Sequence, residues 1–421
     1  MKRIHIIAAL VLILFSSCRR EADYMPYIGE TGKLAYSTYS EQFEYIWKVI
    51  STGYVFWDVD TTDWDAMYER YMPRFQELDK RCEQVGYIPT SELNDLYTGV
   101  IGGLRDHHLS FLLRNLHPAP DDQFSSVSVN PSNLDIPFRD YYIESASEEK
   151  AGLLAFLENI DSQYNVGEHE SCQEHISEIG ATVNYHYILF SLPDGRKVPY
   201  LWQSMACITP AIRQGGEAAK LLDNYFKAIV ETPRSQLAGI VIDNRCNRGG
   251  YQDDLDYLVG TYLNERVEIM KTRYKEGPGR LEHSPWTSYY LSPNQKYHRD
   301  ITAENIPYVV ICDIHSVSMG EIEPMVVKAV LPTGYTIGER THGGTGPLQP
   351  ADCINLNYGG PFGDPSLSKG HYVYTSSFEA SIGGKVMEGI GHTPDQTVLR
   401  KDYNGDFRPQ LDAALEYIGK H

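Results

Sequence analysis

The sequence predicts a layered α/β domain preceded by a small bundle of helices. Amphipathic helical spacing is found in residues 36–115, and strand-like and helix-like segments alternate from residue 185 to residue 421. In addition, polar loops follow two buried strand-like runs, at residues 244–250 and 313–318. Because ligand sites in α/β sheets lie at the carboxyl ends of strands, these loops are the expected location of a functional site.

The N-terminus has the layout of a bacterial secretory signal peptide, assigned to residues 1–17. Lys2 and Arg3 precede an apolar run, residues 4–15, that is too short to span a bilayer as a stable helix. The following Ser-Ser-Cys fits a lipobox, in which Cys18 would receive the lipid, although Phe15 replaces the usual smaller aliphatic residue. The alternative is an ordinary cleaved signal with an incidental cysteine. We expect residues 18–35 to form a lipidated tether that anchors a periplasmic or outer-membrane lipoprotein to a lipid membrane of the cell envelope.

Three helices are expected to form the bundle of residues 36–115. The first carries apolar residues from Phe43 to Tyr54 at helical spacing, and the second extends from Trp64 to Phe75. The third follows Pro89 and carries an apolar stripe that reaches residue 104. Since each helix has one apolar face, the three are expected to pack against one another.

Residues 116–184 are weakly patterned and remain without a domain assignment, except for one helix expected near residues 148–160. A polar cluster in this region, residues 169–175, contains two histidines and invites a metal-site interpretation. The helix of a zinc protease would need its second histidine where Gln173 stands. We therefore favour the polar face of a helix or loop, and we predict no metal and no other cofactor.

From residue 185 onward the expected elements alternate. A hairpin is predicted around a Pro-Asp-Gly turn at residues 193–195, with strands over residues 185–191 and 198–208. Helices are predicted over residues 221–229, over residues 255–262 and from residue 318 onward. Strands alternate with them over residues 237–243, 308–312 and 335–338. This alternation is typical of an α/β domain, which we assign to residues 185–421.

Composition excludes several classes of protein. The formal net charge of −19 would repel phosphate backbones, so no nucleic-acid partner is expected. Apart from Cys18, the cysteines are widely spaced and form no CxxC pair, which excludes the common zinc-ribbon patterns. Cys207 and Cys312 lie in apolar strand-like runs and are expected to be buried free thiols.

Two strand-to-loop junctions carry the residues best suited to chemistry. Residues 239–250 end a buried strand in a polar turn, where Gly249 and Gly250 let backbone N–H groups face a ligand. Residues 309–321 deliver Ser318 to the start of a helix, where unpaired N–H groups and the helix dipole favour an oxyanion. A serine at a helix N-terminus is usually a cap, so the second junction gains meaning only together with the first.

Together the two junctions resemble the C-terminal-processing (tail-specific) serine protease family. That family's strand motif ends in Arg-x-Asn-x-Gly-Gly, and its nucleophile lies three residues before a glutamate. The matching positions are Arg245, Asn247, Gly249, Gly250, Ser318 and Glu321. Residues 337–344 and 387–395 match two further motifs, so the resemblance covers roughly residues 40–420 in the family's motif order. It implies a ClpP/crotonase-like catalytic domain. Residues 116–184 show no clear carboxylate-binding loop of the PDZ module that the family often carries, so tail specificity is not expected.

The catalytic design implied by the resemblance uses a histidine. Bacterial processing proteases use a serine and a lysine, but Gly344 stands at the position of that lysine. The sequence is instead similar to the tricorn and interphotoreceptor retinoid-binding protein branch, whose Asp-x-His segment matches residues 106–108. By this resemblance Ser318 is the nucleophile, His108 is the general base, and Glu388 helps to orient the base. The implied donors of the oxyanion hole are the N–H groups of Gly249 or Gly250 and of Met319, and the implied supporting residues are His107, Arg245 and Asn247.

The implied activity is that of a serine-type endopeptidase that hydrolyses peptides or unfolded protein segments outside the cytoplasm. Two alternatives remain open: a catalytically silent peptide- or ligand-binding lipoprotein on the same scaffold, and a lipid-anchored structural or nutrient-capture protein. The joint presence of Ser318, His108 and Glu388 favours the enzyme. Pro324 removes a backbone donor shortly after Ser318, so we expect the helix either to begin later or to have bent first turns.

Overall fold

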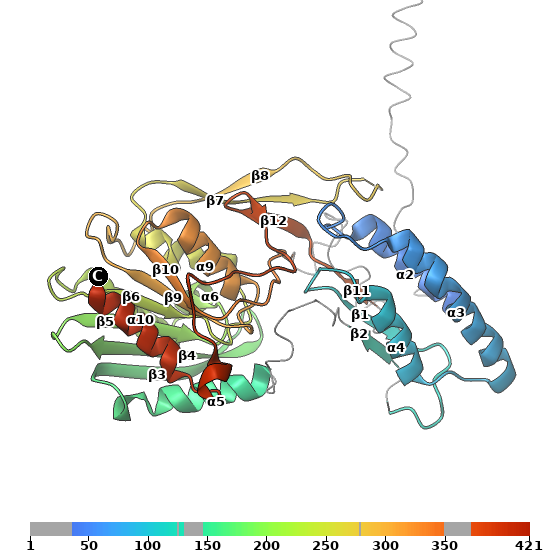
Figure 1. Cartoon of the computed structure of the whole chain (residues 1–421), viewed down its shortest axis with the longest axis horizontal. Helices are drawn as coiled ribbons and strands as arrows, with labels where there is room; N and C mark the ends of the chain where they lie inside the picture. The colour runs from blue at the N-terminus through green and yellow to red at the C-terminus, as the bar shows by residue number, and fades with distance from the viewer. Residues whose placement is uncertain (1–35, 124–125, 130–145, 278, 349–371) are drawn as a thin grey trace, which may run out of the picture.

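The structure is a computed structural model that describes residues 36–123, 126–129, 146–277, 279–348 and 372–421. It contains an N-terminal helical unit, a seven-stranded sheet covered by helices, and two smaller sheets (Figure 1). The predicted signal peptide and Cys18 lie outside the described residues. None of the helices in the described ranges is long and apolar enough to cross a membrane.

The N-terminal unit contains the three predicted helices, which are α2 (Tyr39–Gly53), α3 (Trp64–Val85) and α4 (Thr90–Ile101). Their apolar faces share one core, in which the rings of Phe43 and Phe75 stack with centroids 4.5 Å apart. α3 is longer than predicted, since the helix continues past Pro73 until Gly86 adopts a φ of 84°. A left-handed residue of this kind is a common end of a helix because glycine adopts it without steric cost.

The central sheet has the strand order β14-β10-β9-β6-β5-β4-β3. Its strands are β3 (Val166–Ile176), β4 (Ala181–Ser191), β5 (Lys197–Gln203), β6 (Ile240–Asp243), β9 (Tyr308–Cys312), β10 (Gly334–Gly338) and β14 (Gln396–Thr397). The strands from β5 to β14 in this order are parallel, whereas β3, β4 and β5 pair antiparallel. The carboxyl ends of β6, β9 and β10 therefore meet at one edge of the sheet.

Helices cover both faces of this sheet. One core contains residues of α6 (Ile208–Gln214), α7 (Gly216–Val230), α8 (Leu255–Leu258) and α9 (Met319–Val330). The other contains residues of α5 (Ala146–Glu158) and α10 (Arg408–Lys420). The strands alternate between the two cores: Ile240 and Ile242 of β6 join the first, and Val241 joins the second. This alternation produces three layers, in agreement with the layered α/β domain that the sequence predicted.

Several local predictions need correction. Residues 169–175 belong to the strand β3, not to a helix or loop, and their polar character reflects the place of β3 at the edge of the sheet. The central sheet therefore begins at Val166, within the region that the sequence left unassigned. The second strand of the hairpin ends at Gln203, and α6 begins at Ile208. The helix predicted over residues 255–262 is limited to α8 and a following 3₁₀ turn.

Two smaller sheets link the helical unit to the central sheet. The first contains β1 (Ser110–Arg114), β2 (Ser126–Val129) and β11 (Tyr372–Tyr374), and the second contains β7 (Val267–Tyr274), β8 (Thr287–Leu291), β12 (Phe378–Ile382) and β13 (Lys385–Val386). The connection between β7 and β8 contacts the helical unit: Arg280 pairs with Asp65 and lies over the rings of Trp47 and Trp57. These contacts connect the second of the smaller sheets to the helical unit.

Candidate active site

Ser318 lies where the chain leaves β9 and enters α9. Its backbone has φ 56° and ψ −121°, a conformation that glycine adopts easily and that is strained for a residue with a Cβ atom. α9 begins directly after it at Met319, with Pro324 inside the helix, so the alternative of a later helix start is wrong. The strain indicates that the surrounding structure, rather than local preference, sets the position of this serine.

The loop after β6 fixes the turn that carries Ser318. The carbonyl of Asn247 accepts the N–H of Val317 at 3.0 Å, and the side-chain oxygen of Asn247 accepts the N–H of Gly249 at 2.9 Å. A Cβ atom at position 249 would lie 2.5 Å from Ser318 Cβ and 2.9 Å from its Oγ. Position 249 must therefore be a glycine, and the hydroxyl of Ser318 lies directly against it. Because the Gly249 N–H is already used by Asn247, an oxyanion hole would have to take its donors from Gly250 and Met319.

A second turn, residues 105–108, lies between α4 and β1 and carries His108. The hydroxyl of Tyr54 accepts the N–H groups of Arg105 and Asp106 at 2.9 and 3.2 Å. The buried carboxylate of Asp106 accepts the N–H of His108 at 2.8 Å. It also accepts the N–H and the hydroxyl of Ser376, at 2.7 and 2.8 Å. These bonds tie the turn both to the residue that follows α2 and to the segment between β11 and β12.

Gly344 brings the two turns together. Its carbonyl accepts the N–H of Ser318 at 3.0 Å, and a Cβ atom at this position would lie 3.6 Å from His108 Cε1. One nitrogen of His108 and one carboxylate oxygen each of Asp106 and Glu388 lie within 4.8 Å of one another. The structure therefore gathers the three residues implied by the resemblance, Ser318, His108 and Glu388, around one glycine.

Glu388 uses its buried carboxylate mainly to hold backbone. One oxygen accepts the N–H of His107 at 2.9 Å, and the other accepts the N–H groups of Thr345 and Gly346 at 2.6 and 2.7 Å. The Nδ1 atom of His108 is buried and forms no hydrogen bond within the described residues. Glu388 thus holds the backbone next to His108, and one of its oxygens lies within 4.8 Å of a His108 nitrogen.

Asp106 is a site residue that the sequence argument passed over. The only signal for it was the Asp-x-His segment itself, in which the acid was used to locate the histidine and received no role. Burial lowers the pKa of His108, and the nearby carboxylate of Asp106 acts in the opposite direction. Burial also raises the pKa of both Asp106 and Glu388. His108 is therefore neutral near pH 7, the protonation state that a general base needs.

His107 lies beside the site, and neither of its ring nitrogens forms a hydrogen bond with the residues that the structure describes. Its ring packs edge-on against His342, with centroids 4.2 Å apart. Burial, followed by the neighbouring His342 and His108, lowers the pKa of His107 to about 2, so this side chain is neutral. Its backbone N–H, bonded to Glu388, is the part of His107 that connects it to the other site residues.

Arg245 has a different place from Asn247. Its buried guanidinium pairs with Asp243 at 2.5 Å and donates to the carbonyl of Phe407 and the side chain of Gln410, at 2.8 and 3.1 Å. It therefore joins the end of β6 to the start of α10 on the far side of the sheet. Arg245 supports the site only through the fold, whereas Asn247 touches the turn of Ser318.

Three groups of acidic, histidine or cysteine side chains in the described residues have ligand atoms close enough to hold a metal ion. They are Asp58, His283 and Glu379; Asp106, His108 and Glu388; and Glu149, Cys246 and Asp313. Neighbouring groups already engage their acids: Arg273 pairs with Asp58 and Glu379, backbone N–H groups surround Glu388, and Arg400 pairs with Glu149. We therefore propose no metal ion at any of these three groups.

Glu321 binds three backbone N–H groups and one hydroxyl around the Ser318 turn. Its oxygens accept from Gly344 at 2.6 Å, Gly343 at 2.8 Å, Thr341 Oγ1 at 2.7 Å and Ser318 at 3.3 Å. Glu321→Ala would leave these donors buried without a partner, so we expect the free energy of unfolding in urea to fall by about 3 kcal/mol. The exposed Glu265→Ala is the matched control and should change stability little. Equal stability of both variants would contradict this role of Glu321.

Comparison with known proteins shows similarity to peptidases in sequence and in fold. Residues 211–398 match the sequence model of peptidase family S41. A search of curated proteins found no significant match. The fold is similar to a structure from Parabacteroides merdae described as that of a candidate peptidase, with 20% identity, a TM-score of 0.59, and coverage of 91% of this chain and 97% of the other. It is also similar to mature CPAF solved in complex with lactacystin, with 13% identity, a TM-score of 0.53, and coverage of 91% and 99%.

The family match spans the loop after β6, the Ser318 turn, and the glycine-rich segments that hold His107 and Gly344. Residues 211–398 therefore match peptidase family S41, and together with the similar folds this match supports a serine-type peptidase that resembles the C-terminal-processing proteases.

Proposed function

We propose that the chain is an endopeptidase that cleaves peptides or unfolded protein segments with Ser318 as nucleophile and His108 as general base. The observation that carries this proposal is the position of Gly344, which bonds to the backbone of Ser318 and lies against the ring of His108. The Ser318 oxygen attacks the scissile carbonyl carbon while His108 takes the hydroxyl proton. His108 then gives that proton to the leaving amine, and a water molecule hydrolyses the acyl-enzyme by the same steps.

Two buried carboxylates support the imidazolium that forms on His108 during the reaction. Asp106 lies two residues before His108 and accepts its backbone N–H, and an oxygen of Glu388 lies within 4.8 Å of a nitrogen of His108 and of an oxygen of Asp106. Because backbone donors hold both carboxyl groups in place, these groups do not have to reorganise when charge develops on His108. We assign Asp106 as well as Glu388 to the orientation of the base.

The N–H groups of Gly250 and Met319 are the proposed donors to the developing oxyanion. Gly250 adjoins the glycine that contacts the Ser318 hydroxyl, and Met319 is the first residue of α9, where the helix dipole favours negative charge. Each such donor is worth about 10²- to 10³-fold in rate in other serine hydrolases. The Gly249 N–H shapes the loop instead, through its bond to Asn247.

A fluorophosphonate probe tests the proposal directly, because it forms a covalent P–O bond with an activated serine and releases fluoride. We expect labelling of the purified protein at Ser318, identified by mass spectrometry of the modified peptide. Heat-unfolded protein is the matched control and should not be labelled. Absence of labelling at Ser318 in the folded protein would favour the silent binding protein considered above.

We also propose that the mature protein is held in the cell envelope by a lipid on Cys18. The supporting observation is the sequence alone, where the apolar run and Ser-Ser-Cys precede a polar tether. The full chain is expected in the membrane fraction, partitioning into detergent, and Cys18→Ala should release it or block its processing. Cys82→Ala is the control and should remain in the membrane fraction. Wild-type protein that is freely soluble and unmodified outside the cell would contradict the anchor.

A further inference from the structure

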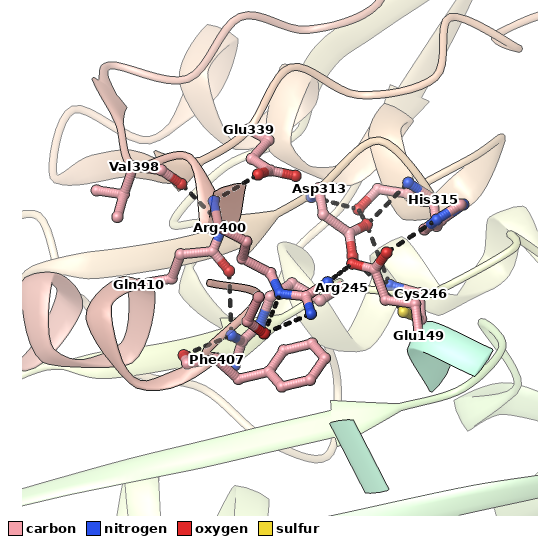
Figure 2. A network of polar contacts seen from close by, with 12 residues as sticks. Glu149, Arg245, Cys246, Asp313, His315, Glu339, Val398, Arg400, Phe407 and Gln410 are labelled. Atoms are coloured by element: carbon pink, nitrogen blue, oxygen red, sulfur yellow. Dashed lines mark hydrogen bonds and ion pairs between the residues drawn. The ribbon is translucent and has the colours of Figure 1, made fainter. Parts of the chain in front are cut away.

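A buried polar network joins the first turn of α5 to Asp313 and His315, in the turn that precedes Ser318 (Figure 2). Its central residue is Glu149, which comes from the first turn of α5 and is 1% exposed. One oxygen of Glu149 lies 3.1 Å from Nε2 of His315, and the other pairs with the guanidinium of Arg400. Figure 2 shows Glu149 making both contacts. A single buried carboxylate therefore connects α5 to the loop of the nucleophile.

His315 belongs to the turn that delivers Ser318. Its backbone N–H donates to Asp313 at 3.0 Å, and the same carboxylate accepts the N–H of Cys246 at 3.1 Å. The next residue, Ser316, bonds to the carbonyl of Asn244 at 2.7 Å. These bonds fix the backbone of the turn to the loop after β6, whereas Glu149 fixes the side chain of His315 from the outside. A shift of the His315 side chain would be transmitted through residues 316 and 317 to Ser318.

Charge explains why an acid occupies this position. Arg400 also donates its backbone N–H to Glu339 at 2.7 Å, and its guanidinium lies over the ring of Phe407. Although burial acts against it, the contact with Glu149 and the nearby Asp313 raise the pKa of His315. Glu149 thus lies between the guanidinium of Arg400 and the ring of His315 in a buried space, and it is a partner for both.

We infer that Glu149 is a positioning residue for the nucleophile: by pairing with His315 it fixes the turn of residues 313–318, so that the docking of α5 is a condition for an active Ser318. The inference rests on the proposed role of Ser318 as nucleophile. It assigns a role in catalysis to a helix that contributes no group to the reacting atoms. The position of Ser318 then depends on contacts from α5 as well as on the loops after β6 and β10.

The test compares Glu149→Gln with Glu158→Gln, an exposed glutamate at the end of the same helix. We expect Glu149→Gln to lower kcat and the rate of fluorophosphonate labelling by about 10- to 100-fold, the effect expected of a small misplacement of a reacting group. KM should stay unchanged, because the substrate does not touch Glu149. Amide hydrogen exchange at residues 315–318 should become faster than in Glu158→Gln.

A double-mutant cycle with His315→Gln separates positioning from general destabilisation. Glu149→Gln should cost little further activity in the His315→Gln background, since the two residues act through one contact. Wild-type rates and exchange in Glu149→Gln, or losses that simply add, would overturn the inference. If the wild type itself is not labelled at Ser318, the proposed function fails, and the exchange measurement alone decides whether Glu149 holds the turn.

Discussion

Ser318→Ala is expected to lower the hydrolysis of an unstructured peptide by about 10⁴-fold or more, because it removes the only group proposed to attack the carbonyl. His108→Ala should cost a similar factor, since an unactivated serine is a weak nucleophile at neutral pH. The double variant should lose little beyond either single variant, because two groups that act as one unit are not additive. The measurement is kcat for a fluorogenic peptide, with residual activity checked for contaminating protease.

Lysine variants are the matched control for this mechanism. Lys328 pairs with Asp395 at 3.0 Å, Lys385 lies on the exposed strand β13, and Lys369 lies outside the described residues. At Gly344, where a lysine base would stand, a Cβ atom would already lie 3.1 Å from the Cβ of His107. Methionine at any of the three lysines should leave kcat nearly unchanged. Full activity in His108→Ala together with loss on replacing one lysine would overturn the mechanism while leaving the fold assignment intact.

The enzyme is expected to hydrolyse peptides at pH values below about 6.5, which is the ordinary pKa of histidine. Burial lowers the pKa of His108, so its neutral form, which is the base, persists to lower pH than in free histidine. The value of kcat/KM should therefore fall only when the pH drops below about 6.5. Asp106→Asn removes a charge that stabilises the imidazolium, so it should move this acid limb to still lower pH.

The same Asp106→Asn change should also lower kcat strongly, by about 10²- to 10⁴-fold, because the imidazolium formed in the transition state loses its fixed counter-charge. The measurement is the pH profile of kcat/KM for both proteins, with the exposed Asp121→Asn as the control. An acid limb above pH 6.5 in the wild type, or an upward shift in Asp106→Asn, would contradict this assignment of the base.

The sequence predicted those elements whose pattern is local. The sequence predicted the buried strand of residues 308–312 and the helix start at Ser318, because each depends on a pattern of adjacent residues. The strand β3 was missed because an edge strand of a sheet does not need an apolar face, and its exposed polar residues resemble those of a loop.

Contacts between distant segments account for the rest of the site. Ser376 fixes the carboxylate of Asp106 across a separation of 270 residues, and Glu388 holds His107 across 281 residues. No periodicity connects such pairs, so only the resemblance to a family could suggest that they meet. The hydrogen bond from the Gly249 N–H to the Asn247 side chain could likewise not be predicted, because it depends on the path of the loop rather than on residue type.

The strained backbone of Ser318 implies a trade-off between the stability of the fold and its catalytic activity. A residue with a side chain held at φ 56° and ψ −121° costs on the order of 1–3 kcal/mol, and glycine would relieve most of that cost. A chain selected for stability alone would therefore place glycine at position 318. The serine keeps the fold below its attainable stability, and the dense hydrogen bonding of Glu321 and Asn247 compensates for this at the same turn. Stabilising substitutions for this enzyme are thus better sought far from β9, where no reactive group depends on an unfavourable backbone.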